Sequence, residues 1–176
     1  MFFRIKRING KEYAYKVKNK WTENGPRQKV AGYLGKVYRL QKKTDLSFES
    51  FVTDIKGKMF AEYLNSLDFD NGIMDLVHWE LTRHGLEKKD REQGNVFGHP
   101  EIDSEIEIGK GFVMAKSREA VLKMNDGYLC SSTLKEVFGA GLVEEQEEGM
   151  DLAKTLINAG LQVPQEVFVK LYEKLS

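Results

Sequence analysis

The chain has 176 residues, 41% of them hydrophobic, and its 27 basic and 27 acidic side chains cancel to a net charge of zero. This composition supports a packed core and excludes a mainly disordered chain. The sequence contains no long apolar run and only one cysteine, Cys130, which exclude a membrane-spanning helix and an internal disulfide. We expect one domain, or one domain with a small appended module, in a reducing cytoplasm and away from membranes.

The charges are distributed unevenly along the chain. Residues 1–43 contain 13 basic side chains and two acidic ones, a net charge of +11, whereas the remaining residues contain 14 basic and 25 acidic side chains, a net charge of −11. A cationic segment of this size concentrates polyanions and neutralises phosphates, and the acidic remainder repels them. The sequence therefore places the partner-binding surface at the amino-terminal end.

This basic segment is predicted to begin with a β-hairpin. Apolar and basic side chains alternate at period two between Phe3 and Val17, and Asn9-Gly10 marks a turn between two strands. A two-residue loop would pair Ile5 with Ala14, whereas a three-residue loop ending at Gly10 would pair Ile5 with Tyr13. We favour the three-residue loop, because it keeps one face of the hairpin apolar and the other cationic.

A third strand is predicted from Arg27 to Leu34, where the alternation resumes. The three antiparallel strands would then form a module with one apolar and one cationic face, and the apolar face must be covered because an isolated meander is only marginally stable. A sheet of this width suits a DNA major groove. The residues predicted to bind nucleic acid on the cationic face are Arg4, Lys6, Lys16, Lys18, Arg27, Lys29 and Tyr33.

The rest of the chain is predicted to be mainly helical, because its apolar residues recur at intervals of three and four. The predicted fold class is therefore α+β, with an amino-terminal three-stranded antiparallel sheet followed by a mainly helical part. The predicted divisions are the basic β-module over 1–43, a helical pair packed with it over 44–86, a solvated linker over 87–100, and a carboxy-terminal part over 101–176 with a small hairpin at 105–114 and helices at 117–124, 132–138, 150–159 and 164–175.

The basic module also resembles a known family. The strings that carry the resemblance are Phe3-Arg4-Ile5-Lys6, a Gly-Lys hairpin, Tyr13-Ala14-Tyr15, Asn24-Gly25-Pro26-Arg27-Gln28-Lys29-Val30 and Tyr33-Leu34-Gly35-Lys36-Val37. In this order they resemble the amino-terminal β-module of insertion-sequence transposases of the DDE type, which implies a part in DNA binding. The remainder departs from those enzymes, since it offers no series of strands to carry their catalytic acids. Its segments Asn125–Cys130 and Asp151–Leu161 resemble short stand-alone prokaryotic proteins of no known activity.

Other motifs in the sequence do not predict chemistry. Glu80 and His84 are one helical turn apart, a spacing that can hold a metal, but no third ligand is near them in the sequence. No motif supports Cys130 and His99 as a nucleophile and its base. Gly109-Lys110-Gly111 lacks the length and the trailing Lys-Ser/Thr of a phosphate-binding loop. We therefore expect no enzymatic activity, no metal and no cofactor.

The predicted function is non-enzymatic binding of nucleic acid, with duplex DNA favoured over RNA. One alternative is an interaction or regulatory protein whose basic sheet meets an acidic partner, and another is a transposase-derived remnant without activity. The two carboxy-terminal helices could also form a homodimer, which would double the DNA contact. The apolar residues that would form this dimer interface are Val163, Phe168, Val169 and Tyr172.

Overall fold

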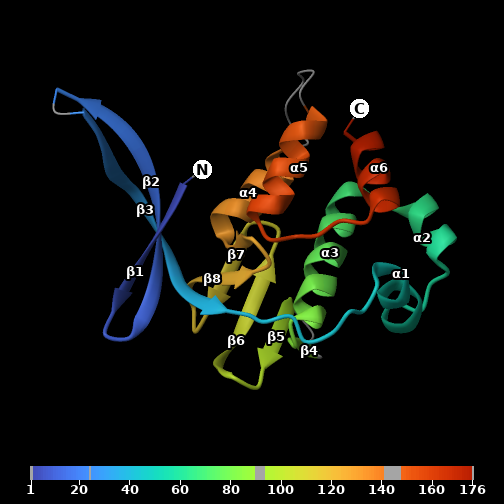
Figure 1. Ribbon diagram of the computed structural model, residues 1–176. Helices are drawn as coiled ribbons and strands as arrows, with labels where there is room; N and C mark the ends of the chain where they lie inside the picture. The colour runs from blue at the N-terminus through green and yellow to red at the C-terminus, as the bar shows by residue number, and fades with distance from the viewer. Residues whose placement is uncertain (1, 24, 90–93, 141–147, 176) are drawn as a thin grey trace.

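The computed structural model describes residues 2–23, 25–89, 94–140 and 148–175. The nine described strands are β1 (Phe2–Ile8), β2 (Lys11–Thr22), β3 (Gly25–Arg39), β4 (Glu87–Lys89), β5 (Asn95–His99), β6 (Ile102–Gly109), β7 (Phe112–Ala115), β8 (Arg118–Met124) and β9 (Gly127–Leu129). They form one continuous mixed sheet in the order β1-β2-β3-β8-β7-β6-β5-β4, and β9 pairs with β8 (Figure 1). Strands β3 and β8 are parallel, and the other pairs are antiparallel.

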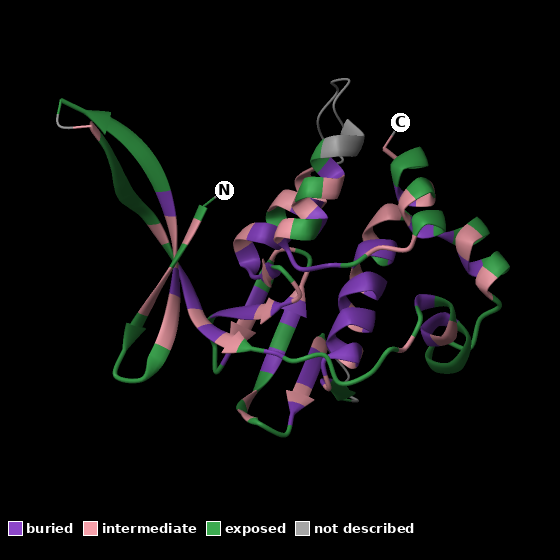
Figure 2. Cartoon of the chain, in the orientation of Figure 1, coloured by how far each residue is buried: buried purple, intermediate pink, exposed green. Residues whose placement is uncertain are grey.

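The helices and the strands β5–β8 enclose the main hydrophobic core. The helices are α1 (Phe48–Ser50), the π-helical turn η1 (Phe51–Ile55), α2 (Phe60–Ser66), α3 (Phe69–Arg83), α4 (Ser131–Gly139), α5 (Glu148–Asn158) and α6 (Gln165–Glu173). Figure 2 shows the buried residues along α3 and the strands beside it. Within the described ranges, none of these helices combines the length and apolar character that crossing a bilayer requires. Core residues include Leu76, Leu81, Phe97, Ile106, Ile108, Leu122, Leu134, Leu156 and Leu171.

The predicted fold class, a three-stranded sheet followed by a mainly helical part, is wrong, because the sheet continues through six further strands. Strand β8 shows why. Its residues Ala120 and Leu122 belong to the main core, and Val121 belongs to a second, smaller core on the opposite face. A strand buried on both faces loses its polar alternation, and its short apolar run then resembles part of a helix.

The predicted linker over 87–100 is also wrong for the residues that the structure describes. It contains β4 and β5, and in β5 the side chains of Val96 and Phe97 are buried. Residues 90–93 of the predicted linker lie outside the described ranges. The charged residues before Gly94 gave this segment the sequence pattern of a solvated linker. Residues 95–99 form a strand because they pair with the neighbouring strand β6.

The second core attaches β1–β3 to the rest of the described structure, which we call the body. Ala14, Leu34 and Val37 from this module meet Val121 and Cys130 from the body. The Cys130 thiol is fully buried in this core. The side of the module that bears Ala14, Leu34 and Val37 is covered by strand β8 and the segment after it, and not by the predicted helical pair.

The favoured three-residue loop between β1 and β2 is wrong, and the two-residue alternative forms. Ile8 pairs with Lys11 across Asn9-Gly10, and Ile5 pairs with Ala14. Both turn residues have positive φ, 49° and 75°, as a type I′ turn requires. This turn matches the twist of the strands, and that advantage outweighs the separation of apolar and cationic side chains on which the prediction depended.

Gly35 is required where β3 joins β8. Its φ is +127°, and a Cβ atom there would lie 2.4 Å from the Glu119 carbonyl oxygen. We expect Gly35→Ala to lower the free energy of unfolding by about 3 kcal/mol, since the strained backbone and the clash act together. Gly32→Ala is the matched control, because a Cβ atom at Gly32 would meet nothing within 4 Å. Urea denaturation measures both variants, and equal stabilities would contradict the argument.

Candidate nucleic-acid interface

Strands β2 and β3 continue past the body as a two-stranded arm, which comprises residues 18–29. Figure 1 shows the arm extending away from the helices and the other strands, and Figure 2 shows that it is exposed. Every described arm residue is exposed except Gly25, which is intermediate, and Trp21 near the tip is 80% exposed. Asn24, part of the sequence resemblance, lies outside the described residues. The arm thus projects a ribbon into solvent without contributing to either core.

Two irregularities in β3 mark the point where the arm leaves the body. The β2–β3 register shifts between Ala14 and Tyr15 and again between Lys16 and Val17, which leaves Leu34 and Ala31 of β3 without a directly opposite residue. Bulges of this kind bend a ribbon and increase its twist. We infer that these bulges direct the arm away from the sheet.

Four cations share one face of the arm. Lys18 is paired with Lys29, and Lys20 is paired with Arg27. Directly opposite residues of an antiparallel ladder project from the same face, and so do residues two positions apart on one strand. The opposite face carries the pairs Asn19–Gln28 and Trp21–Pro26. We call the side that bears Lys18, Lys20, Arg27 and Lys29 the cationic face of the arm.

These four cations have no ion-pair partner in the described part of the chain, where the ion pairs belong to other cations. Like charges directly opposite each other on a ribbon destabilise it, by roughly 0.2–1 kcal/mol for each pair. Two such pairs in an exposed arm therefore hold a positive potential that the protein's own described carboxylates do not neutralise. A polyanion is the ligand that would relieve the repulsion.

The seven residues predicted to bind nucleic acid do not share one face, and that expectation is wrong. Lys18, Arg27 and Lys29 lie on the cationic face of the arm, and Lys16 lies at its base with its Nζ atom 3.6 Å from Glu136 Oε1 of α4. The other three residues, Arg4, Lys6 and Tyr33, lie on the opposite face of the ribbon, since Arg4 pairs with Tyr15, Lys6 with Tyr13 and Tyr33 with Tyr15.

Lys20 is a candidate residue of the cationic face that the sequence prediction missed. The prediction followed the basic residues of the second strand only as far as Lys18, but β2 continues to Thr22. The segment Lys18-Asn19-Lys20 has low β-propensity, and it is extended because β3 pairs with it over the whole arm. The continued alternation of Lys16, Lys18 and Lys20 could have identified it.

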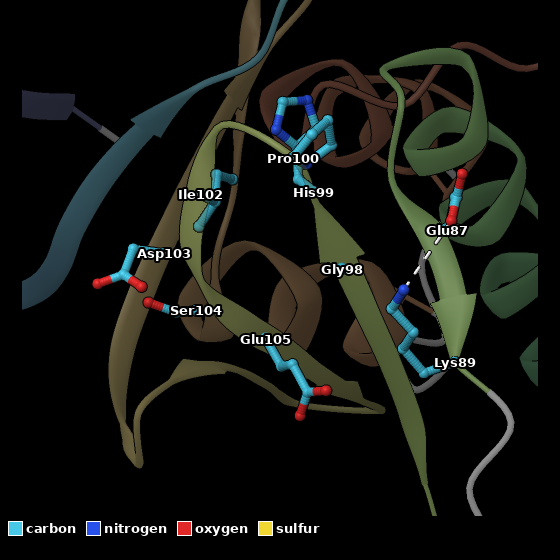
Figure 3. Close-up of a pocket in the computed structure, with 9 residues that line it drawn as sticks. All are labelled: Glu87, Lys89, Gly98, His99, Pro100, Ile102, Asp103, Ser104 and Glu105. Atoms are coloured by element: carbon cyan, nitrogen blue, oxygen red, sulfur yellow. Dashed lines mark ion pairs between the residues drawn. The ribbon is translucent and has the colours of Figure 1, made fainter.

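A cavity of about 520 Å³ lies at the other end of the sheet, beside β4, β5 and β6. Figure 3 shows that the carboxylates of Asp103 and Glu105 lie apart from the His99 ring and do not converge with it. His99 Nδ1 accepts a hydrogen bond of 3.1 Å from the Glu101 backbone N–H, and Lys89 Nζ lies 3.9 Å from Glu87 Oε2. In the part of the chain that is described, no group of three or more His, Cys, Asp or Glu side chains could hold a metal.

Glu80 and His84, whose spacing could hold a metal but for which no metal is predicted, have a structural environment. Both side chains are buried, and Glu80 is occupied by hydrogen bonds from Arg83, Asn125 and the Gln162 backbone N–H. His84 Nδ1 lies 2.7 Å from the Glu80 carbonyl oxygen. These contacts hold α3 against the β8–β9 turn and against the segment between α5 and α6. The Glu80–His84 pair therefore has a structural role, and the arm is the candidate site.

Comparison with known proteins returned no matching family model, no matching curated protein and no matching solved structure. The resemblance of the amino-terminal module to transposases therefore stays a prediction from its residues. The function has to be inferred from the geometry of the arm.

Proposed function

We propose that the protein binds duplex DNA through the cationic face of the arm and catalyses no reaction. The observation that carries the proposal is the group of four cations on one face of an exposed ribbon, without ion-pair partners among the described residues. A two-stranded ribbon fits the major groove of B-DNA, where its flanking cations reach the phosphates. Arg27, the arginine of this group, has the bidentate donors that recognise guanine.

Duplex DNA suits the arm better than duplex RNA does. The major groove of A-form RNA is deep and narrow and does not admit a ribbon, whereas that of B-DNA is about 12 Å wide. The acidic remainder of the chain, with its net charge of −11 over residues 44–176, repels phosphates and orients the molecule with the arm toward the DNA.

An acidic protein is the second candidate partner, and one contact favours it. The Lys16 ammonium, at the base of the cationic face, lies 3.6 Å from the Glu136 carboxylate of the same chain. A carboxylate can therefore approach this side of the ribbon. The contact involves one cation that is only partly exposed, however, and the four arm cations beyond it stay without such a partner among the described residues.

The double variant Lys20→Gln/Arg27→Gln tests the proposal. Each phosphate contact makes the slope of log K against log salt steeper by about 0.9. At 0.1 M salt, one such contact corresponds to about eightfold in affinity. We expect the variant to bind a blunt DNA duplex about 60-fold more weakly at this salt concentration and to have a slope smaller by about 1.8. Fluorescence anisotropy across a salt series measures both quantities.

The matched control removes two cations elsewhere. Lys154 and Lys170 lie on α5 and α6, each beside a carboxylate three residues away, and Lys154→Gln/Lys170→Gln should leave the affinity unchanged. Equal weakening by both double variants would contradict the proposal. If the unaltered protein does not bind duplex DNA at low salt, the proposal fails and the acidic protein becomes the favoured partner.

A further inference from the structure

The opposite face of the β1–β3 ribbon carries a cluster of tyrosines near the base of the arm. We call it the tyrosine face and define it by Tyr13, Tyr15 and Tyr33. The Tyr33 ring centroid lies 5.5 Å from that of Tyr15 and 6.4 Å from that of Tyr13. Tyr33 is 52% exposed, and the other two are intermediate. The rings therefore hold one another in place while part of their surface faces solvent.

Cations surround this cluster. The register places Lys6 beside Tyr13, Arg4 beside Tyr15 and Lys36 across from Tyr13. The Lys6 ammonium lies 5.0 Å from the centroid of the Tyr15 ring. The lysine and arginine side chains beside the rings add positive potential to an apolar surface. This combination suits a ligand that has both flat rings and negative charge.

The tyrosine face carries no carboxylate among its described residues. Glu12, the acidic residue of β2, pairs with Arg7 on the other face, where its carboxylate accepts a 2.7 Å hydrogen bond from Arg39. Partial burial, and then the neighbouring phenols of Tyr13 and Tyr15, raise the pKa of Tyr33. The phenol is therefore neutral at physiological pH, and no described residue of this face repels a phosphate.

On the same side of the ribbon, one more aromatic ring lies near the tip of the arm, beyond the polar pair Asn19–Gln28. On the same side of the ladder, Val17 pairs with Val30, and beyond them Trp21 pairs with Pro26 near the tip. Trp21 is 80% exposed. Val17 is buried, whereas the arm beyond it is exposed on this side, as the exposed ribbon in Figure 2 shows.

We propose that the tyrosine face binds an unpaired DNA strand, with bases stacked on its rings and phosphates beside Arg4, Lys6 and Lys36. This inference rests on the proposed function and extends it from the duplex to its unpaired end. Bases inside a duplex are already stacked and cannot reach protein rings, whereas unpaired bases stack on aromatic side chains with little regard to sequence. The surrounding cations and the absence of carboxylates complement a phosphate backbone.

The two faces of the ribbon would bind different parts of one DNA molecule. The cationic face of the arm would hold the duplex, and a strand that leaves the duplex at a junction or end would cross to the tyrosine face. Because the ribbon is only one strand layer thick, a few unpaired nucleotides cover this distance. The protein would therefore prefer junctions between double-stranded and single-stranded DNA.

Three probes test this inference: a blunt duplex, and the same duplex with a 3′ or a 5′ overhang of about ten thymidines. We expect an overhang to tighten binding by the unaltered protein about tenfold or more, as stacking on one or two rings provides. Tyr33→Ala should remove this gain and leave the affinity for the blunt duplex unchanged. Tyr33→Phe, which keeps the ring, should retain the gain.

The outcomes separate this inference from the proposed function. Lys20→Gln/Arg27→Gln should weaken binding of all three probes and preserve the ratio between them. A gain that survives in Tyr33→Ala, or no gain from either overhang, would overturn the role of the tyrosine face. Binding of the overhang probes without binding of the blunt duplex would overturn the duplex role of the arm and support the tyrosine face. Thermal unfolding confirms that each variant is folded before its affinity is interpreted.

Discussion

Replacing residues 18–29 with the tetrapeptide Thr-Asn-Gly-Thr should weaken binding to duplex DNA by more than about 1,000-fold while the protein still folds. The change removes all four cations of the arm, and four phosphate contacts correspond to a salt slope of about −3.6 and to about three orders of magnitude at 0.1 M salt. This is the largest effect on binding that the structure predicts, because it deletes the whole cationic face of the arm at once.

The fold should survive because none of the described arm residues belongs to either hydrophobic core. The two new threonines take the place of the Lys18–Lys29 pair in the ladder, so the shortened ribbon closes on an existing register position. Asn-Gly already closes the β1–β2 hairpin of this protein with positive φ at both residues. Removal of two like-charge pairs further favours the shortened ribbon.

Anisotropy titrations measure the loss of affinity for duplex DNA, and thermal unfolding shows whether the shortened protein folds. The control is Asn19→Ala/Gln28→Ala, which alters a cross-strand pair on the other face of the same arm and should leave duplex affinity close to that of the unaltered protein. A shortened protein that is folded and still binds duplex DNA tightly would show that the arm is not the binding element.

The sequence predicted the location of the candidate site but not its geometry. The charge asymmetry and the alternation in the first forty residues identified the module and three of the four cations of the arm. The assignment of side chains to faces failed because it depends on turn type and bulges. A two-residue turn moves Tyr15 beside Arg4, and the bulge at Leu34 moves Tyr33 beside Tyr15. Shifts of one residue reverse the face of every side chain beyond them.

The remainder of the sheet could not be predicted from local patterns. Strand β8 is formed by its neighbours, because it pairs in parallel with β3, which lies about eighty residues earlier in the chain. Gly35 permits this pairing, but a glycine in a strand indicates only that some close approach occurs. Long-range pairing of this kind overrides the helical periodicity of Arg118–Met124, and a single sequence does not show it.

Glu80→Ala should lower the free energy of unfolding by about 3–5 kcal/mol, the largest loss of stability that we expect from a side-chain truncation in this protein. The Glu80 carboxylate is fully buried and accepts hydrogen bonds from Arg83 Nη1 at 3.0 Å, the Gln162 backbone N–H at 3.1 Å and Asn125 Nδ2 at 3.2 Å. It therefore connects α3 to the β8–β9 turn and to the segment between α5 and α6.

The loss is large because truncation isolates a buried charge. Arg83 is only 5% exposed, and its Nε atom makes no hydrogen bond to any described residue, so Glu80 supplies the carboxylate that balances the guanidinium. Glu80→Gln keeps the shape and an acceptor but removes the charge, and we expect an intermediate loss of about 1.5–3 kcal/mol. Removing one member of a buried pair costs more than the pair itself contributes, since the remaining charge stays desolvated.

Urea denaturation at neutral pH measures these losses, and Glu173→Ala is the control. Glu173 forms an exposed pair with Lys170 on α6 at 2.7 Å, and such pairs contribute less than about 1 kcal/mol. A loss of stability for Glu80→Ala no greater than that of the control would contradict the role assigned to this network. Because Glu80 lies in the body and the four cations lie on the arm, the folded fraction of Glu80→Ala should bind duplex DNA as tightly as the unaltered protein does.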